Sequence, residues 1–318
     1  MNYVFTFIGE FGYELFNWQG VVRKWSRENK KPGDRIIICS RKGMWPWYAD
    51  FADDYYDILN IPAYKNSVAD CYTGYIFVNG TNQYMPRKQW QIERTGVHIN
   101  EIKETIINYF KPTESEPMKF IFSCDYQVMD GFHFGMGGPG GGSIYTNRLN
   151  LNNNEYVKVE IPEYETHKKL VESKIDLSTP YTLVQSAFRT GYDHKASTEI
   201  DHKSLFNNIE KRIIMIDFDS GRFNDSKSKF NGNFETYHCN SFEEQAVLIT
   251  EADECVFTTV GDFRSHVYLP PMLGKDVTII APQDVWVLES SSIDFWNHNI
   301  FKFGGKMRKI VYEDLFIK

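Results

Sequence analysis

Short apolar segments that resemble strands alternate with segments of helical spacing along both halves of the chain, and this alternation constrains the fold more than any other feature. The first repeat is the strand-like run 3–8, followed from Leu15 by apolar residues at helical spacing. Such alternation is typical of a largely parallel sheet with helices on both faces. The pattern therefore predicts an α/β fold.

The alternation stops once, at a glycine-rich loop, 135–142, and the asparagine-rich stretch after it. In the first half we expect strands at 3–8, 35–39, 75–78 and 119–123, and helices from 15 onward, at 45–59 and at 100–110. In the second half we expect strands at 181–186, 212–217, 234–237, 254–259 and, as the last, 277–281, with helices at 205–211, 242–252 and 266–273. Two Rossmann-like domains, 1–160 and 161–318, are therefore predicted, and the glycine-rich loop is either a lid over a ligand or a spacer.

Composition excludes several classes of protein. A hydrophobic content of 42% argues against general disorder, and no apolar run reaches the ~18 residues of a membrane span. The start of the chain lacks the basic and apolar regions of a signal peptide, so we expect a cytoplasmic protein. The five cysteines show no zinc-site spacing. The net charge of −7 includes a slightly basic first stretch, because residues 1–112 hold 14 Lys and Arg against 12 Asp and Glu.

The turn between the first strand and helix holds two carboxylates, Glu10 and Glu14, beside Gly9 and Gly12. In an open α/β sheet, ligands bind at this carboxyl edge of the strands. A carboxylate at that edge is suited to take a proton from a reacting hydroxyl, and it is equally suited to stabilise its own helix through the dipole. Glu10 is our first candidate for a general base, and Glu14 is the second.

Two turns of the second half have the chemistry of an anion site. Small hydroxyl residues and glycine between a strand and a helix let backbone amides approach a phosphate, and arginine supplies a planar fork of donors. An ordinary capped turn and a solvated charged loop are the alternatives. The residues that we expect to bind such an anion are Gln185, Ser186, Arg189, Lys195, Thr258, Thr259, Gly261, Ser265 and His266.

A second candidate binding region lies in the first half. Trp45 and Trp47 follow the second strand and would form either a stacking wall for a sugar or base, or part of the core. Polar residues after the strand at 119–123 are expected at the same sheet edge as the first turn. The candidate residues of this region are Gly12, Trp45, Trp47, Asp125 and His133.

The layout resembles the GT-B glycosyltransferases. The residues that carry the likeness are the Gly9–Glu14 turn, the Gln185–Arg189 loop, and Ser241–Gln245 leading through Thr258–Gly261 to Ser265. The resemblance implies two Rossmann-like domains that face each other across a cleft. The first would bind the acceptor, at the candidate residues of the first half, and the two turns of the second would bind the donor, a nucleotide-sugar such as a UDP-sugar. The resemblance also implies a carboxylate base in the first domain and a donor diphosphate held without a metal or other cofactor.

The acceptor is open at this stage. Richness in Asn, Lys, Ile, Phe and Tyr suggests an AT-rich genome such as that of many bacteriophages, whose DNA sugar transferases share this architecture. The acceptor hydroxyl is then expected on 5-hydroxymethylcytosine in DNA, with a surface glycan as the alternative.

Two rival interpretations rest on other features. Asp217 and Asp219 end an apolar strand as Asp-x-Asp, a pattern that holds Mn²⁺ or Mg²⁺ in the GT-A glycosyltransferases. Such short matches arise by chance in a chain with 42 acidic residues, so a metal is not expected. The second rival is a non-catalytic protein that binds and sequesters a nucleotide.

Overall fold

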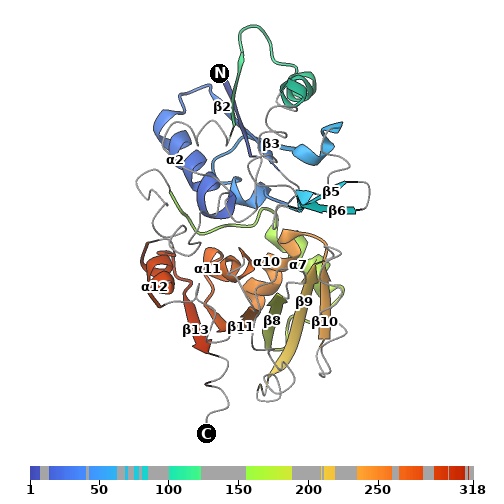
Figure 1. The fold of residues 1–318 in the computed structure, drawn as a ribbon, viewed down its shortest axis with the longest axis vertical. Helices are drawn as coiled ribbons and strands as arrows, with labels where there is room; N and C mark the ends of the chain where they lie inside the picture. Colours follow the sequence, from blue (N-terminus) through green and yellow to red (C-terminus); the bar gives the residue numbers. More distant parts are fainter. Residues whose placement is uncertain are drawn as a thin grey trace. The chain divides into compact units, whose positions relative to one another are not determined.

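The computed structural model describes residues 1–7, 14–40, 43–62, 69–70, 75–78, 81–84, 100–122, 155–187, 209, 211–218, 235–259, 265–281, 290–299, 301–311 and 314. The chain divides into two compact units, Met1–Glu155 and Tyr156–Lys318 (Figure 1). Within the described ranges, no helix is both long enough and apolar enough to cross a membrane.

The first unit is built on a four-stranded sheet in the order β3-β2-β1-β7. Its strands are β1 (Asn2–Thr6), β2 (Arg35–Ser40), β3 (Asp54–Asp57) and β7 (Met118–Phe122). Every neighbouring pair is parallel. Parallel strands are joined by crossovers that cover the sheet, which explains why a central strand such as β2 is a nearly continuous apolar run.

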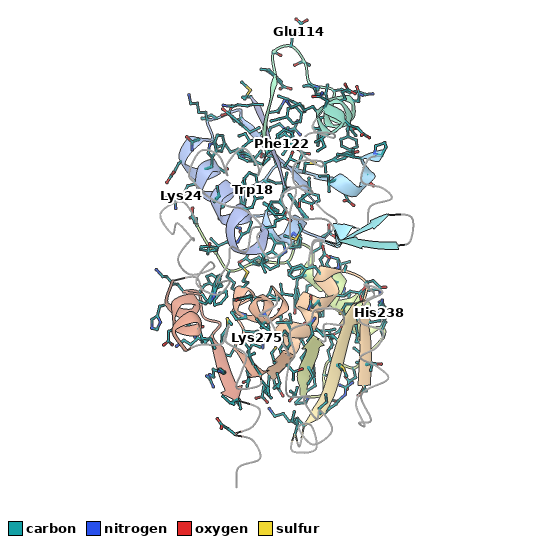
Figure 2. The ribbon with its side chains drawn as sticks, in the orientation of Figure 1. Trp18, Lys24, Glu114, Phe122, His238 and Lys275 are labelled. Carbon is teal, nitrogen blue, oxygen red and sulfur yellow. The ribbon has the colours of Figure 1, made fainter. Side chains whose placement is uncertain are left out.

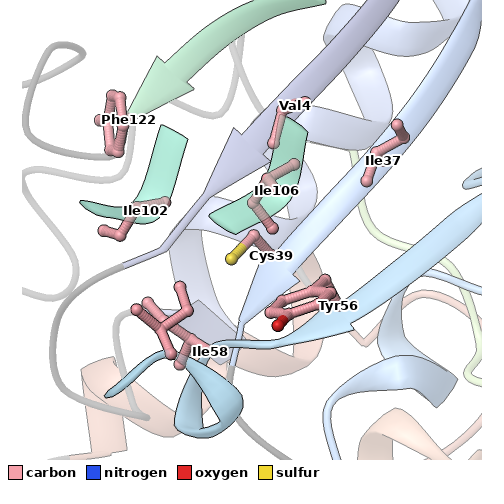
Figure 3. Packing of buried hydrophobic residues seen from close by; sticks show 9 residues of the cluster. Val4, Ile37, Cys39, Tyr56, Ile58, Ile102, Ile106 and Phe122 are labelled. Carbon is pink, nitrogen blue, oxygen red and sulfur yellow. The ribbon is translucent and has the colours of Figure 1, made fainter. Parts of the chain in front are cut away.

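Both faces of this sheet are covered, and β1 shows how its side chains divide between them. Val4 packs into a cluster with Ile102 and Ile106 of the helix at 100–110 (Figure 3). Phe5 turns to the opposite face, where its ring lies 6.2 Å from Trp18 and 5.0 Å from that of Trp25. This alternation follows from the two-residue period of a strand. Trp18 is fully buried and lies in the interior of the first unit (Figure 2).

The helical segments of the first unit differ from one expectation. They are a π-helix η1 (Glu14–Trp18), α2 (Gln19–Asn29), the short 3-10 helices η2 (Trp45–Trp47) and η3 (Ile58–Asn60), and residues 100–110. The predicted helix at 45–59 was wrong, because it has only short 3-10 helices at its two ends and β3 lies between them. The residues of β3 pair with Ile37–Ser40, and this non-local pairing overrides the helical spacing.

A small second sheet departs further from the predicted pattern. The segment at 75–78 is a strand, as expected, but it does not join the parallel sheet. It is β5 (Tyr75–Val78), which pairs antiparallel with both of its neighbours in the order β4-β5-β6. The neighbours are β4 (Ala69–Asp70) and β6 (Thr81–Tyr84). A two-residue connection between β5 and β6 allows only an antiparallel hairpin.

The second unit is built on a six-stranded sheet in the order β10-β9-β8-β11-β12-β13. Its strands are β8 (Tyr181–Ala187), β9 (Arg212–Phe218), β10 (Glu235–Cys239), β11 (Glu254–Thr259), β12 (Val277–Ala281) and β13 (Met307–Val311). All neighbouring pairs are parallel. The expectation that β12 is the last strand was wrong, since β13 adds a further edge strand.

Helices connect these strands. They are α7 (Tyr164–Glu172), α10 (Phe242–Glu251), η5 (Ser265–Tyr268), α11 (Leu269–Met272) and α12 (Ser290–Asn299). The expected N-cap of α10 is confirmed, because Ser241 accepts from the backbone N–H of Glu244 at 3.2 Å. The hydroxyl of Tyr181 donates to the carbonyl of Leu248 at 2.8 Å and fastens α10 to β8. The helix expected at 205–211 falls almost wholly outside the described residues.

Both sheets follow one topological rule. Numbered within each unit, the strands of the parallel sheets run 3-2-1-4 in the first unit and 3-2-1-4-5-6 in the second. This is the order of the Rossmann fold, in which the chain leaves the first strand in one direction and later returns to its other side. The prediction of two Rossmann-like α/β domains is therefore confirmed. The crevice at each reversal of strand order is where such sheets bind ligands.

Candidate functional site

The strand order locates a switch point in the first unit between β1 and β7. Thr6 and Phe122 are register partners at the carboxyl ends of these strands. The chain that leaves β1 carries Glu10 and Gly12, and the chain that leaves β7 carries Asp125 and His133. These four candidates lie outside the described residues. The topology nevertheless starts both of their segments at neighbouring strand ends.

Glu14 is described, and its environment is unusual for a carboxylate. It is fully buried at the start of η1. The hydroxyl of Tyr48 donates to its Oε1 at 2.7 Å, and the Ser40 hydroxyl donates to the same oxygen. Burial of a carboxylate is costly unless hydrogen bonds compensate for lost water, and donors to a charged acceptor are the stronger kind. The two hydroxyls therefore allow Glu14 to occupy the interior.

The cluster around Glu14 extends along the ends of β2 and β3. Burial raises the pKa of the Tyr55 hydroxyl, the negative charge of Glu14 adds to that rise, and a hydrogen bond with Ser40 opposes it. Burial likewise raises the pKa of the Cys39 thiol, against a hydrogen bond with Thr6. The phenol and the thiol are therefore protonated at neutral pH. Both groups therefore remain hydrogen-bond donors near the carboxyl ends of β2 and β3.

The cluster also fixes both ends of the segment that carries Glu10. Before that segment, the backbone N–H of Phe7 donates to the carbonyl of Cys39 at 3.0 Å. After it, Glu14 accepts from Ser40, the next residue of β2. Phe7 and Glu14, the described residues on either side of 8–13, thus contact the last two residues of β2. Glu14 is therefore fixed against the end of β2.

The two candidate tryptophans have different environments. Trp47 is fully buried, and its carbonyl accepts from the Arg23 guanidinium at 2.8 Å. Trp45 is half-buried, and its ring lies edge-on to Tyr55 at 5.9 Å. A ring needs an accessible face to stack on a ligand. Of the two, only Trp45 retains exposed surface for such a contact.

The second unit has its switch point between β8 and β11. In this register Ser186 lies opposite Thr258, and Ala187 lies opposite Thr259. The two turns that the sequence assigns to the donor therefore leave adjacent strand ends. Thr258 is buried, whereas Ser265 and His266 begin η5 after the turn. Arg189, Lys195 and Gly261 belong to these turns and lie outside the described residues.

A hydrogen-bonded pair of side-chain amides joins α10 to β8 near this edge of the sheet. The Nε2 of Gln245 in α10 donates to the Oε1 of Gln185 in β8 at 2.9 Å. Gln245 is buried and Gln185 is half-buried. The bond fixes the orientation of the Gln185 amide two residues before the end of β8. Gln185 is thus held in place at the strand where the donor is predicted to bind.

The amino end of α10 is already occupied by the protein's own negative charge. Glu244 is buried there, and it accepts from the hydroxyl of Tyr237 at 2.9 Å and from Lys174 at 3.3 Å. Burial alone would raise the pKa of Glu244, but these bonds and the Asn240 backbone N–H lower it. A carboxylate at a helix N-terminus satisfies the dipole that would otherwise attract a phosphate. The turn after β11 is therefore the better place for a diphosphate.

The metal alternative finds little support in the part of the chain that the structure describes. There, no three His, Cys, Asp or Glu side chains gather in a way that could hold an ion. Asp217 is in β9, in register with His238, whereas Asp219 is outside the described residues.

The sequence analysis did not relate three residues to the candidates Glu14 and Gln185. They are Ser40, Tyr48 and Gln245, which contact Glu14 or Gln185. A hydroxyl at the end of the second strand and a tyrosine within an expected helix carry no local signal of a carboxylate partner. Gln245 does lie near the N-cap of a clear helix, so helical spacing could have placed it on the inner face.

No protein-family model matches the chain, and no curated protein matches it. Among solved structures, it is similar to a glycosyl transferase of family 9 from Veillonella parvula, with 7% identity, a TM-score of 0.50, and coverage of 97% of this chain and 86% of that chain. It also matches the E. coli ADP-heptose lipopolysaccharide heptosyltransferase II, with 8% identity, a TM-score of 0.46, and coverage of 98% and 90%. An E. coli heptosyltransferase with ADP matches with 9% identity, a TM-score of 0.47, and coverage of 98% and 97%.

The likeness to the Veillonella parvula structure concerns the fold, because identity is so low. It extends over nearly the whole of this chain, and both units have the Rossmann strand order. The GT-B fold expected from the sequence is therefore confirmed.

Proposed function

We propose that the chain is a glycosyltransferase, which moves a sugar from a nucleotide-sugar to an acceptor hydroxyl. The observation that carries the proposal is the register of β8 and β11. It brings the two predicted phosphate-binding turns to adjacent strand ends at the switch point of a Rossmann-type sheet. The GT-B fold supports the same activity, although a fold by itself does not determine function.

The roles follow from these positions. The diphosphate of the donor is bound by the turns after β8 and β11, with Arg189 and Lys195 neutralising the charge that develops on departure. UDP is the proposed nucleotide. Glu10 takes the proton from the acceptor hydroxyl, because general-base catalysis requires direct hydrogen-bond reach. Glu14 is a positioning residue, since its buried carboxylate accepts from Ser40 and Tyr48.

The acceptor is proposed to be a glycan hydroxyl. The net charge of −7 disfavours a polyanionic acceptor, because DNA affinity comes mostly from neutralising phosphates with Lys and Arg. 5-Hydroxymethylcytosine in DNA is the competing acceptor, and the slightly basic first stretch of the chain favours it. Trp45 is the proposed stacking residue for either acceptor.

The activity is tested with a panel of UDP- and ADP-sugars, each incubated with the full chain. Mass spectrometry detects sugar released by slow hydrolysis and sugar transferred to glycan or to hydroxymethylated DNA. Release of one sugar is expected. If nucleotides protect the chain against thermal unfolding but no sugar is released or transferred from any donor, the nucleotide-sequestering alternative replaces this proposal.

Variants then separate the two carboxylates. Glu10→Gln is expected to lower turnover about 10²- to 10⁴-fold without weakening donor binding, because that is the usual range for a general base. Glu28→Gln, on the exposed end of α2, is the matched control and keeps full activity. Full activity in Glu10→Gln would refute its role. Loss of turnover in Glu14→Gln at unchanged stability would make Glu14 the base instead.

The metal alternative has its own test. Turnover is expected to persist in EDTA, since the proposed clamp uses protein donors. Activity that is lost in EDTA and restored by Mn²⁺ would move Asp217 and Asp219 to the centre of the mechanism. A cytoplasmic location stays part of the prediction.

A further inference from the structure

Arg23 in α2 is buried and uses all of its hydrogen-bond donors. Its Nε and NH2 groups donate to the two carboxylate oxygens of Asp50 at 2.8 and 3.0 Å. The second of these nitrogens, Nη2, also donates to the carbonyl of Trp47 at 2.8 Å. The remaining nitrogen, Nη1, donates to the Gln19 side chain, and it donates to the carbonyl of Glu155 at 3.1 Å. These five bonds equal the number of N–H donors that a guanidinium has. Arg23 therefore joins three separate parts of the first unit.

One of these parts is the last residue of the first unit. Glu155 is fastened to α2 at three points: its backbone N–H donates to the carbonyl of Gly20 at 3.1 Å, its carbonyl accepts from Arg23, and its carboxylate pairs with Arg27 at 2.8 Å. The chain passes into the second unit directly after this residue. Glu155 is thus the point at which the connection leaves the first unit.

The connection is fastened again soon afterwards. Val159 is buried in the second unit, and its backbone N–H donates to the carbonyl of Met272 at 2.8 Å. Only residues 156–158 lie between the two fastened points. The connection between these two points is therefore short, and hinges are commonly a few such residues.

Besides its own helix, where it contacts Gln19, Arg23 also joins the segment at 45–51. This segment contains Trp45, the proposed stacking residue, and it contributes the Trp47 carbonyl and the Asp50 carboxylate. The guanidinium also lies over the Phe51 ring, 5.1 Å from its centroid. One rigid, planar group therefore contacts both this segment and the connection at Glu155.

We infer that Arg23 is a positioning residue that couples the segment at 45–51 to the end of the inter-unit connection at Glu155. The physical basis is the shape of the guanidinium, whose donors have fixed relative directions. If Asp50 no longer holds the fork, the guanidinium tilts and the N–H that serves Glu155 leaves its carbonyl. The coupling is reciprocal, as all equilibrium coupling must be.

Hydrogen exchange of the free, full-length chain tests the coupling without any ligand. Asp50→Asn keeps the size of the side chain but weakens the fork, and the Asp50 side chain is already 40% exposed, so the variant is expected to fold. We expect exchange to accelerate on the order of tenfold not only at 45–52 but also in the peptide that covers 153–158. A change confined to 45–52 would overturn the inference.

Two further variants isolate the route. Arg27→Met removes the exposed ion pair with Glu155 but leaves Arg23 intact, so exchange at 45–52 is expected to stay at the wild-type rate. In an Arg23→Lys background, Asp50→Asn should add no further acceleration at 153–158, because lysine cannot reproduce the fork. Additive effects in that background would refute a route through Arg23. Since no activity is measured, the outcome is independent of the proposed function.

Discussion

Tyr48→Phe removes one hydroxyl from the buried carboxylate of Glu14 and leaves the ring in place. The hydroxyl donates to Oε1 at 2.7 Å, and both residues are fully buried, so water cannot replace the lost donor. A hydrogen bond to a charged group contributes about 1.5–3 kcal/mol, and we expect that loss in the free energy of unfolding. The ring contact with Phe51, at 6.0 Å, survives the substitution and does not contribute to the difference.

The assay is differential scanning calorimetry of the full chain. For a unit of this size, each kcal/mol moves the midpoint by about 2–4 °C, so a fall of about 3–12 °C is expected. Tyr109→Phe is the control, because the Tyr109 side chain is 63% exposed and its change should stay within about 0.5 kcal/mol. In a Glu14→Gln background the loss should shrink, since a neutral acceptor gains less from the hydroxyl.

The reasoning is refuted if Tyr48→Phe is as stable as the wild-type chain. It is also refuted if the loss is the same in the Glu14→Gln background, because the effect would then not arise from the bond to Glu14. Either result would remove the structural basis for assigning Glu14 a positioning role.

Two further predictions concern the second unit. Hydrogen bonds, first that from the Ser178 side chain, lower the pKa of Asp176 to about 2, below its unfolded value of about 3.9. The stability that Asp176 adds is therefore present above about pH 4 and is lost as the pH falls toward 2. A Ser178→Ala variant should show a flatter acid dependence of the unfolding midpoint. Gly305→Ala should lower the free energy of unfolding in urea by about 1–3 kcal/mol, because a Cβ would lie 2.6 Å from the backbone carbonyl oxygen of Lys275. Gly33→Asn is the control: this position has open space at φ +85°, so its free energy of unfolding should change little.

Much of the fold could be predicted because the strands of a doubly covered sheet carry their own signal. The run at Ile36–Cys39 is fully buried, and its apolar character alone identified it as a strand. The N-cap at Ser241 could also be predicted from the sequence, since a cap acts within one turn of its helix. The segment at 54–57 was not, because two aspartates flank two tyrosines and only pairing with β2 makes it a strand.

The candidate site divides along the same line. Local chemistry indicated that Glu10, Glu14 and the hydroxyl-rich turn at Thr258 belong to strand ends. That Glu14 is buried against Ser40 and Tyr48 depends on residues 26 and 34 positions away, which no local pattern relates to it. The partnership of Gln185 with Gln245 is likewise a contact over 60 positions.

The sequence by itself determined most of the strands of the two parallel sheets, where polar turns interrupt them, and that two α/β halves follow each other, because these properties arise from short-range periodicity and capping. Only the tertiary structure decided the order of the strands, and with it the pairing of Ser186 with Thr258 at a switch point. It also decided that Glu14 is buried against Ser40 and Tyr48 and that Arg23 joins the connection at Glu155 to the segment at 45–51. Strand order and burial depend on which distant segments share one core, and that is settled by packing of the whole unit.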